Sequence, residues 1–171
     1  MTDKSETQAP ESKSDPTEMP RTFLLVVDAS AEMRAALRFA CRRAIHTDGR
    51  VALFHAVEPA DFHHFASIGE LMETEARSEA EKLLQRTAAD VQKQTGKMPS
   101  VVLREGDTIE QLLAVLEEEK NISVLVLGAS AGDDGPGPLV TALSGRLAGK
   151  INLPVTIVPG GLDDDAIDEM T

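Results

Sequence analysis

Short apolar runs that alternate with longer helical segments constrain the fold of this chain more than any other feature. The runs are too short for helices and continuous enough to be buried on both faces. Because strands joined through helices form right-handed crossovers, the pattern predicts a three-layer α/β domain around a parallel sheet. The predicted strands are residues 23–27, 51–57, 100–103, 124–127 and 154–158, and the predicted helices are 31–46, 67–95, 108–120 and 139–151.

Apolar stripes and start signals define the predicted helices. Ser30 is placed to cap the first helix, and Gly106-Asp107 to cap the third. The first helix carries its apolar stripe at Met33, Leu37, Ala40, Cys41 and Ala44. The second helix carries its stripe at Leu71, Ala76, Ala80, Leu83, Leu84, Ala88 and Val91. We expect each stripe to face the sheet.

Acidic residues gather at the two ends of the sequence. Residues 1–20 hold five acidic and two basic side chains, and residues 161–171 hold five acidic and none basic. These compositions predict disordered tails on either side of one domain over residues 21–160. The net charge of −12 argues against a nucleic-acid partner. No apolar run is long enough to span a membrane, and the polar start predicts a cytoplasmic protein.

Ligands of parallel α/β sheets bind beyond the carboxyl ends of the strands, where the strand order reverses. Asp28 follows the first predicted strand, and a loop rich in Gly, Asp and Pro follows the fourth over residues 128–138. Glycines there would let backbone N–H groups approach a phosphate. Neither GxxxxGK[ST] nor GxGxxG occurs, and no Lys or Arg lies between Lys120 and Arg146. A purely structural loop is therefore an equal alternative.

Other chemically capable residues each have a simpler interpretation. Asp28 could accept hydrogen bonds from a base or ribose or hold a metal, or it could only form a turn. Asp61, His63 and His64 share a loop, where we expect them to be solvent-exposed rather than metal ligands. Cys41, the single cysteine, fits a buried apolar position better than a reactive thiol. No nucleophile motif places a histidine beside a serine, which predicts a protein without catalysis.

These segments together resemble the universal stress protein family. The similar segments are residues 24–30, 53–57, 106–113, 126–130 and 153–158, within a stretch of about 21–160. The resemblance implies a Rossmann-like, adenine-nucleotide-hydrolase-like domain whose five parallel strands run in the order 3-2-1-4-5. It also implies a homodimer formed through the last strand. This short, mostly apolar strand, with Val155, Thr156, Ile157 and Val158, would otherwise be an uncovered edge.

Members of that family that bind ATP share a pattern of Gly, two residues, Gly, nine residues, Gly, then Ser or Thr. Here these four slots fall on Gly128, Ala131, Thr141 and Ala142, so one of four is kept. A register shifted to Gly132 and Ser144 breaks the spacing. The candidate nucleotide pocket that the resemblance implies comprises Asp28, Ala56, Gly128, Ser130, Gly132, Thr141 and Ser144.

The sequence thus leaves two functional hypotheses. The first is a non-catalytic stress-response homodimer that acts through a protein partner, with weak or absent nucleotide binding and no cofactor or metal. The second is an adenine-nucleotide-binding switch, or a slow ATPase, that would use ATP with magnesium at the ends of the first and fourth strands.

Overall fold

A computed structural model describes residues 20–59 and 66–171 of the chain. Its centre is a parallel sheet of five strands in the order β3-β2-β1-β4-β5, as the resemblance implied. The order reverses beside β1, whose two neighbours are β2 and β4. The strands are β1 (Thr22–Val26), β2 (Arg50–Val57), β3 (Ser100–Glu105), β4 (Ile122–Ala129) and β5 (Val155–Pro159).

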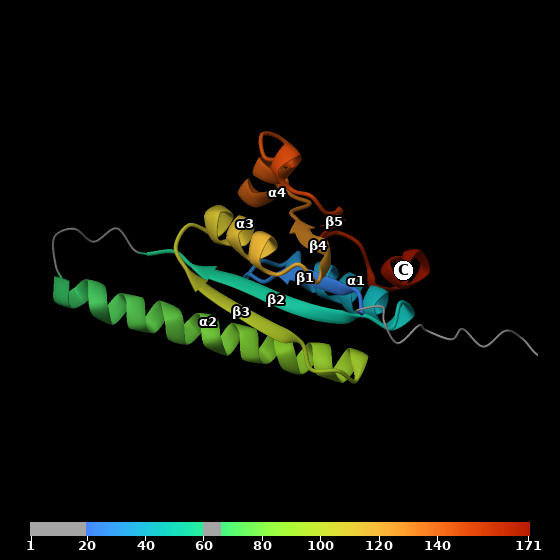
Figure 1. The fold of residues 1–171 in the computed structure, drawn as a ribbon, viewed down its shortest axis with the longest axis horizontal. Coiled ribbons are helices and arrows are strands. Elements are labelled where there is room, and N and C mark those ends of the chain that lie inside the picture. Colours follow the sequence, from blue (N-terminus) through green and yellow to red (C-terminus); the bar gives the residue numbers. More distant parts are fainter. Residues whose placement is uncertain (1–19, 60–65) are drawn as a thin grey trace, which may run out of the picture.

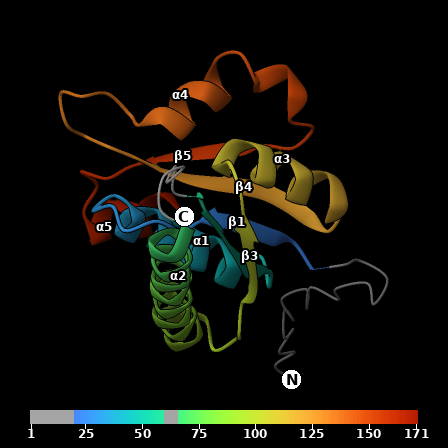
Figure 2. The same ribbon diagram turned by 90° about the vertical axis from the view of Figure 1, so that its left-hand side faces the viewer.

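Helices cover both faces of the sheet and give the domain its three layers (Figure 2). Helices α1 and α2 lie on one face, and α3 and α4 lie on the other. Figure 1 shows α2 running under β2 and β3 and continuing beyond their ends. The helices are α1 (Met33–His46), α2 (Ala66–Thr95), α3 (Thr108–Glu118), α4 (Pro138–Ser144) and α5 (Asp164–Met170), with a short 3₁₀ turn, η1, at Ala148–Lys150.

Two apolar clusters, one on each face of the sheet, form the core. Successive strand side chains point to opposite faces, so Leu24 and Leu25 of β1 belong to different clusters although both are fully buried. Strands that are covered on both faces must be apolar along their whole length, which explains the continuous runs in the sequence. The sheet therefore holds its strand ends at one fixed edge, where the candidate site lies.

Several predicted elements differ from the structure at their ends. Ser30 does not cap α1, because its backbone N–H and its hydroxyl both donate to Asp28. Leu71 and Ala76 do not face the sheet, because the first part of α2 extends past it, and Leu71 is 60% exposed. The helix predicted over 139–151 ends at Ser144, because Gly145 adopts ψ −111° and breaks the helical path before η1. Asp107 caps α3 as predicted by accepting from the Glu110 N–H.

The acidic segment 161–171 is not the disordered tail that its composition predicted. Asp163 caps α5 by accepting a hydrogen bond from the Ala166 N–H at 2.8 Å. Ile167 packs against α1 and β5 and is fully buried. The prediction failed because the partners of this segment lie about 130 positions earlier in the sequence, on α1. Disorder was also predicted for residues 1–20. Residues 1–19 lie outside the described residues, and Pro20 is the one residue of this segment that the structure describes.

Candidate functional site

A cavity of about 590 Å³ lies beyond the carboxyl ends of β1 and β4, where the strand order reverses. Strands β1, β2 and β4 form its floor, and the first turns of α3 and α4 form its walls. Apolar side chains from these elements make up much of the lining. They are Val26, Val27, Leu127, Ile109, Leu139 and Val140. A site of this size and position suits a small organic ligand.

The sequence predicted seven pocket residues, and four of them line this cavity. These are Asp28, Ser30, Ala56 and Gly128. The other three residues, Gly132, Thr141 and Ser144, are not part of the lining. They belong to the loop after β4 and to α4, which present their prolines and apolar residues to the cavity instead.

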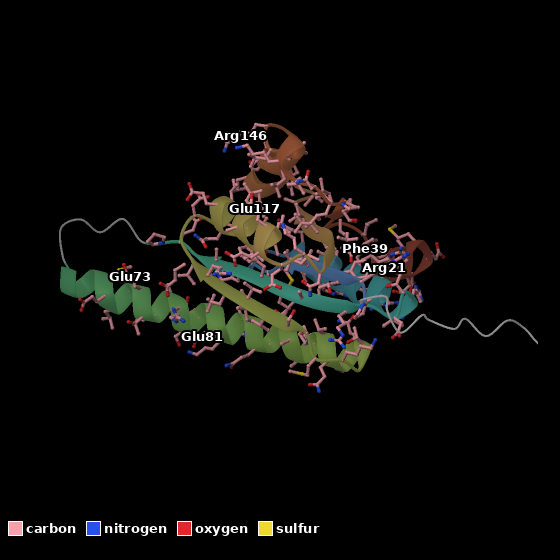
Figure 3. All side chains as sticks on the ribbon, viewed as in Figure 1. Arg21, Phe39, Glu73, Glu81, Glu117 and Arg146 are labelled. Carbon is pink, nitrogen blue, oxygen red and sulfur yellow. The ribbon has the colours of Figure 1, made fainter. Side chains whose placement is uncertain are left out.

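The hydroxyl groups that were predicted to meet a phosphate bond to their own helix. Thr141 Oγ1 donates to the Gly137 carbonyl oxygen at 2.8 Å, and Ser144 Oγ donates to the Val140 carbonyl oxygen at 2.7 Å. Thr141 lines a different hollow on the outer side of α4, together with Arg146. Figure 3 labels Arg146 on the turn that follows α4. Neither hydroxyl therefore faces the cavity beyond β1 and β4.

The glycines after β4 serve the backbone of the loop. Gly135 and Gly137 adopt φ values of 89° and 101°, which side chains rarely tolerate. The loop closes where the Ser130 N–H donates to the Pro136 carbonyl oxygen. The two prolines that face the cavity, Pro136 and Pro138, have no N–H to offer. The loop therefore presents fewer donors to an anion than its glycine content suggested.

The space beside Gly128 is occupied by another residue of the protein, Glu32. A Cβ atom at this position would lie 3.1 Å from the Glu32 backbone carbonyl carbon and 3.2 Å from Glu32 Cγ. The glycine is thus needed so that the start of α1 can approach β4 closely. The close backbone approach that the sequence assigned to a phosphate is made by Glu32 instead.

Four carboxylates line the cavity, and none of its described lining residues is Lys or Arg. Asp28 accepts from the Ser30 N–H at 2.9 Å, and Glu58 Oε1 accepts from Thr108 Oγ1 at 2.8 Å. Asp107 caps α3, and the fourth carboxylate is Glu32. The cavity therefore presents a concentration of negative charge.

His55 is the one basic side chain in the described lining. Its Nδ1 lies 2.7 Å from the Val27 carbonyl oxygen, and because a carbonyl only accepts, Nδ1 carries the proton. In the neutral ring, Nε2 is then left as an acceptor. Sequence reasoning noted this histidine only as part of a strand. It also missed Glu58, Asp107 and Glu32, of which the first two could have been found because they follow the ends of β2 and β3.

The remaining candidates for chemistry do not join the cavity. Cys41 is fully buried on α1, and burial raises the pKa of its thiol to about 12, so it remains protonated at neutral pH. The cluster of Asp61, His63 and His64 lies outside the described residues. Within residues 20–59 and 66–171, no three His, Cys, Asp or Glu side chains are grouped to hold a metal ion. No helix in those ranges is both long and apolar enough to cross a membrane.

The sheet order and the cavity at the point of reversal define this chain as a doubly wound α/β domain. A model of the universal stress protein family matches residues 19–159. The chain belongs to the universal stress protein family.

Several solved structures of similar fold are universal stress proteins. UspA from Lactobacillus plantarum has a TM-score of 0.69 at 14% identity, over 83% of this chain and 99% of that one. A family member from Burkholderia pseudomallei has a TM-score of 0.61 at 20% identity, over 84% and 99%. The Archaeoglobus fulgidus protein in complex with dAMP has a TM-score of 0.57 at 18% identity, over 82% and 99%. No curated protein matches the sequence.

Proposed function

We propose that this chain is a non-catalytic universal stress protein that acts through protein partners as a cytoplasmic homodimer and binds nucleotides weakly or not at all. The observation that carries the proposal is the charge of the cavity beyond β1 and β4, where the strand order reverses. Four carboxylates line it, and its described lining contains no Lys or Arg. A phosphorylated ligand is itself negatively charged and would have to enter against them.

This electrostatic repulsion is large enough to weaken the binding of ATP. At an effective dielectric constant of about 20, two like unit charges about 8 Å apart repel by roughly 2 kcal/mol. A triphosphate carries several charges, and a bound Mg²⁺ cancels only part of them. Pro136 and Pro138 also lack the N–H groups that would offset the repulsion. The lining itself therefore supports the proposal that ATP binds weakly.

The homodimer is proposed to form through β5, which is an outer strand of the sheet. Val155 and Ile157 of β5 are 36% and 39% exposed, so apolar surface accompanies an unpaired strand edge. Pairing with the same strand of a second copy would cover both. Light scattering of the 18.3 kDa chain should give twice the monomer mass, and Ile157→Asp should halve it. Val101→Asp, on the opposite edge strand, should leave the dimer intact, and a monomeric wild type would disprove the dimer.

Nucleotide binding can be tested by equilibrium dialysis of the purified protein against ATP with millimolar magnesium, AMP and adenosine. We expect no saturation by ATP below millimolar concentration. Mass spectrometry of freshly purified protein should find no retained nucleotide. Stoichiometric ATP binding at micromolar concentration would overturn the proposal.

A second candidate function is an adenine-nucleotide switch or slow ATPase, using ATP with magnesium. The observation that favours it is the cavity, because Asp28, Ala56 and Gly128 line it where nucleotide ligands of such folds bind. One similar structure is titled as a complex with dAMP and another as a complex with cAMP. On this hypothesis Asp28→Ala and Gly128→Val abolish binding, and Asp28→Ala is the deciding variant because a side chain at Gly128 also collides with Glu32. Gly132→Val, outside the cavity, is the matched control and should change nothing.

A further inference from the structure

Helix α5 lies against α1 and outside residues 19–159, which the family model matches. It has only seven residues. Figure 2 shows it beside α1, on the same face of the sheet. Ile167 is its only buried residue, and it packs in the core cluster to which Val158 of β5 also belongs.

The surface of α1 under α5 carries a row of arginines. Arg34, Arg38 and Arg42 are each four positions apart, so they project from one side of the helix. Asp164 and Asp168 of α5 are also four positions apart and lie opposite them. We call the three arginines, together with Arg43, the arginine stripe. Arg43 Nη1 donates to the backbone carbonyl oxygen of Thr171 at 3.1 Å.

The two ion pairs that Asp168 makes with α1 are bidentate, whereas Asp164 meets single guanidinium nitrogens of Arg34 and Arg38. Arg38 Nε and Nη2 donate to the two Asp168 oxygens at 2.8 and 2.7 Å, and Arg42 Nε and Nη2 donate to the same oxygens at 2.9 and 2.6 Å. Arg34 Nη2 lies 3.0 Å from each Asp164 oxygen. Guanidinium groups in this geometry recognise the planar carboxylate as well as its charge. We call this set of five side chains the α1–α5 seam.

The attachment of α5 is weaker than its number of bonds suggests. Helices this short are unstable by themselves in water. Partly exposed ion pairs contribute little to stability because water screens them, and Ile167 is the single side chain that α5 buries. The sheet and α1, in contrast, share the extensive core. Helix α5 therefore opens at a lower free energy than the rest of the domain.

We propose that α5 is a displaceable arm, and that the arginine stripe with the apolar hollow that Ile167 fills is the docking surface for an acidic amphipathic helix of a protein partner. This rests on the proposed function, in which the chain acts through partners, and it names the class of partner. The helix that fits carries two carboxylates four positions apart and a branched apolar residue directly before the second. Asp164, Ile167 and Asp168 are the internal copy of that motif.

The α5 arm also determines which anionic molecules can bind to the arginine stripe. When it is displaced, the five acidic residues of segment 161–171 remain tethered next to the stripe. A tethered competitor acts at an effective concentration of about a millimolar. A polyanion without an apolar anchor competes poorly against it, whereas an amphipathic helix also gains the hollow of Ile167. The partner is therefore an acidic protein helix and not a nucleic acid.

The test uses the full chain and a fluorescent synthetic peptide with the sequence of residues 160–171. Ile167→Arg should release the arm, since it removes the anchor and places a cation beside the stripe. We expect the peptide to bind this variant at least tenfold more tightly than the wild type, and more weakly as salt rises. Met98→Arg adds the same charge at a 62% exposed position outside α1 and α5 and should bind like the wild type. Adding Arg38→Gln and Arg42→Gln to the released variant should abolish binding.

Hydrogen exchange of the unmodified chain provides an independent measurement. Amides of α5 should exchange at least tenfold faster than those of α1, and equal protection would overturn the proposal. A folded Ile167→Arg variant that does not bind the peptide would also overturn it. Equal binding of a scrambled peptide or of a short DNA duplex would show an unspecific anion surface instead. None of these outcomes depends on nucleotide or on dimer formation, so they are separate from the tests of the proposed function.

Discussion

The cavity beyond β1 and β4 and the α1–α5 seam both contain acidic side chains. The negative charge is uncompensated in the cavity and is neutralised in the seam. In the cavity, Asp28, Glu58 and Asp107 accept hydrogen bonds from hydroxyl and backbone N–H groups, which leave their charge in place. In the seam, Asp164 and Asp168 each meet guanidinium groups that cancel it. The difference teaches that the composition of a region does not define its charge; the partners of its carboxylates do.

Helix α1 is the element that separates the two regions. Its N-cap residue, Glu32, lines the cavity, while Arg34 begins the arginine stripe only two positions later. Gly160 joins the regions from the other side, because it follows β5, precedes α5 and lies directly against Glu32. Changes in these residues should therefore affect one region, the other or both in a predictable way.

The largest effect is expected from Gly160→Ala, which should disturb both regions together. Its new Cβ atom would lie 2.5 Å from Glu32 Cβ and 2.9 Å from Glu32 Cα, so the backbone must move. Overpacking of this kind costs about 1–3 kcal/mol of unfolding free energy, and we expect a value near the upper end. Urea denaturation measures it. Gly149→Ala is the control, because nothing lies within 4 Å of its Cβ position, and an equal loss there would refute the explanation.

Reversing the charge of the cavity should create the anion site that it lacks. The double variant Glu32→Lys and Glu58→Lys replaces two carboxylates with cations, and ATP should bind at least tenfold more tightly, which corresponds to about 1.4 kcal/mol. Isothermal titration measures the change. Glu73→Lys and Glu81→Lys, on α2 (Figure 3), give the same net charge away from this cavity. If they increase affinity equally, the net charge and not the cavity lining limits binding.

Removing a single carboxylate from the cavity wall should reveal its structural role. Asp107→Ala deletes the cap of α3, where the carboxylate accepts from the Glu110 N–H at 2.9 Å. The loss of an N-cap costs about 1 kcal/mol of unfolding free energy. Asp133→Ala, at an exposed loop position, should be nearly neutral in the same thermal denaturation experiment. Equal stability of the two variants would show that the cap contributes little.

The smallest effect concerns the seam in acid. Hydrogen bonds from Arg38 and Arg42 hold the pKa of Asp168 below its ordinary value. The folded state then binds fewer protons than the unfolded chain, whose aspartates have a pKa of about 3.9. The stabilisation by the seam is therefore complete above about pH 4 and declines as pH falls through the lowered pKa. The stability difference between wild type and Asp168→Asn should shrink in that range, and a difference that is constant with pH would contradict this account.

The elements and the parallel α/β class could be predicted from the sequence because their signals are local, whereas the strand order was implied by the resemblance to the family. Each buried strand is a continuous apolar run, and the helix after Gly106 begins at a recognisable cap. The position of the cavity followed from the same reasoning, since Asp28 and Gly128 end neighbouring strands. Sequence alone predicted that these two residues share one site, and the structure places both in the lining.

The rest could not be predicted because it depends on contacts between distant segments. Five acidic residues within eleven positions are typical of a solvated tail, and only Arg38 and Arg42 of α1 make Asp168 part of a docked helix. Gly128 matched a phosphate-binding glycine in sequence, but the residue that approaches it is Glu32, the N-cap residue of α1. In both cases the decisive partner comes from a different element, which no local pattern reveals.

The part of α2 that extends past the sheet should lose its helicity on warming separately from the rest of the domain. Every side chain from residue 70 to residue 77 is exposed, and this stretch measures about 12 Å at 1.5 Å per residue. With little packed against it, its helicity depends on temperature in the way of an isolated peptide. On warming, circular dichroism should therefore drift well before the cooperative transition, and rotational diffusion should quicken as the rod shortens.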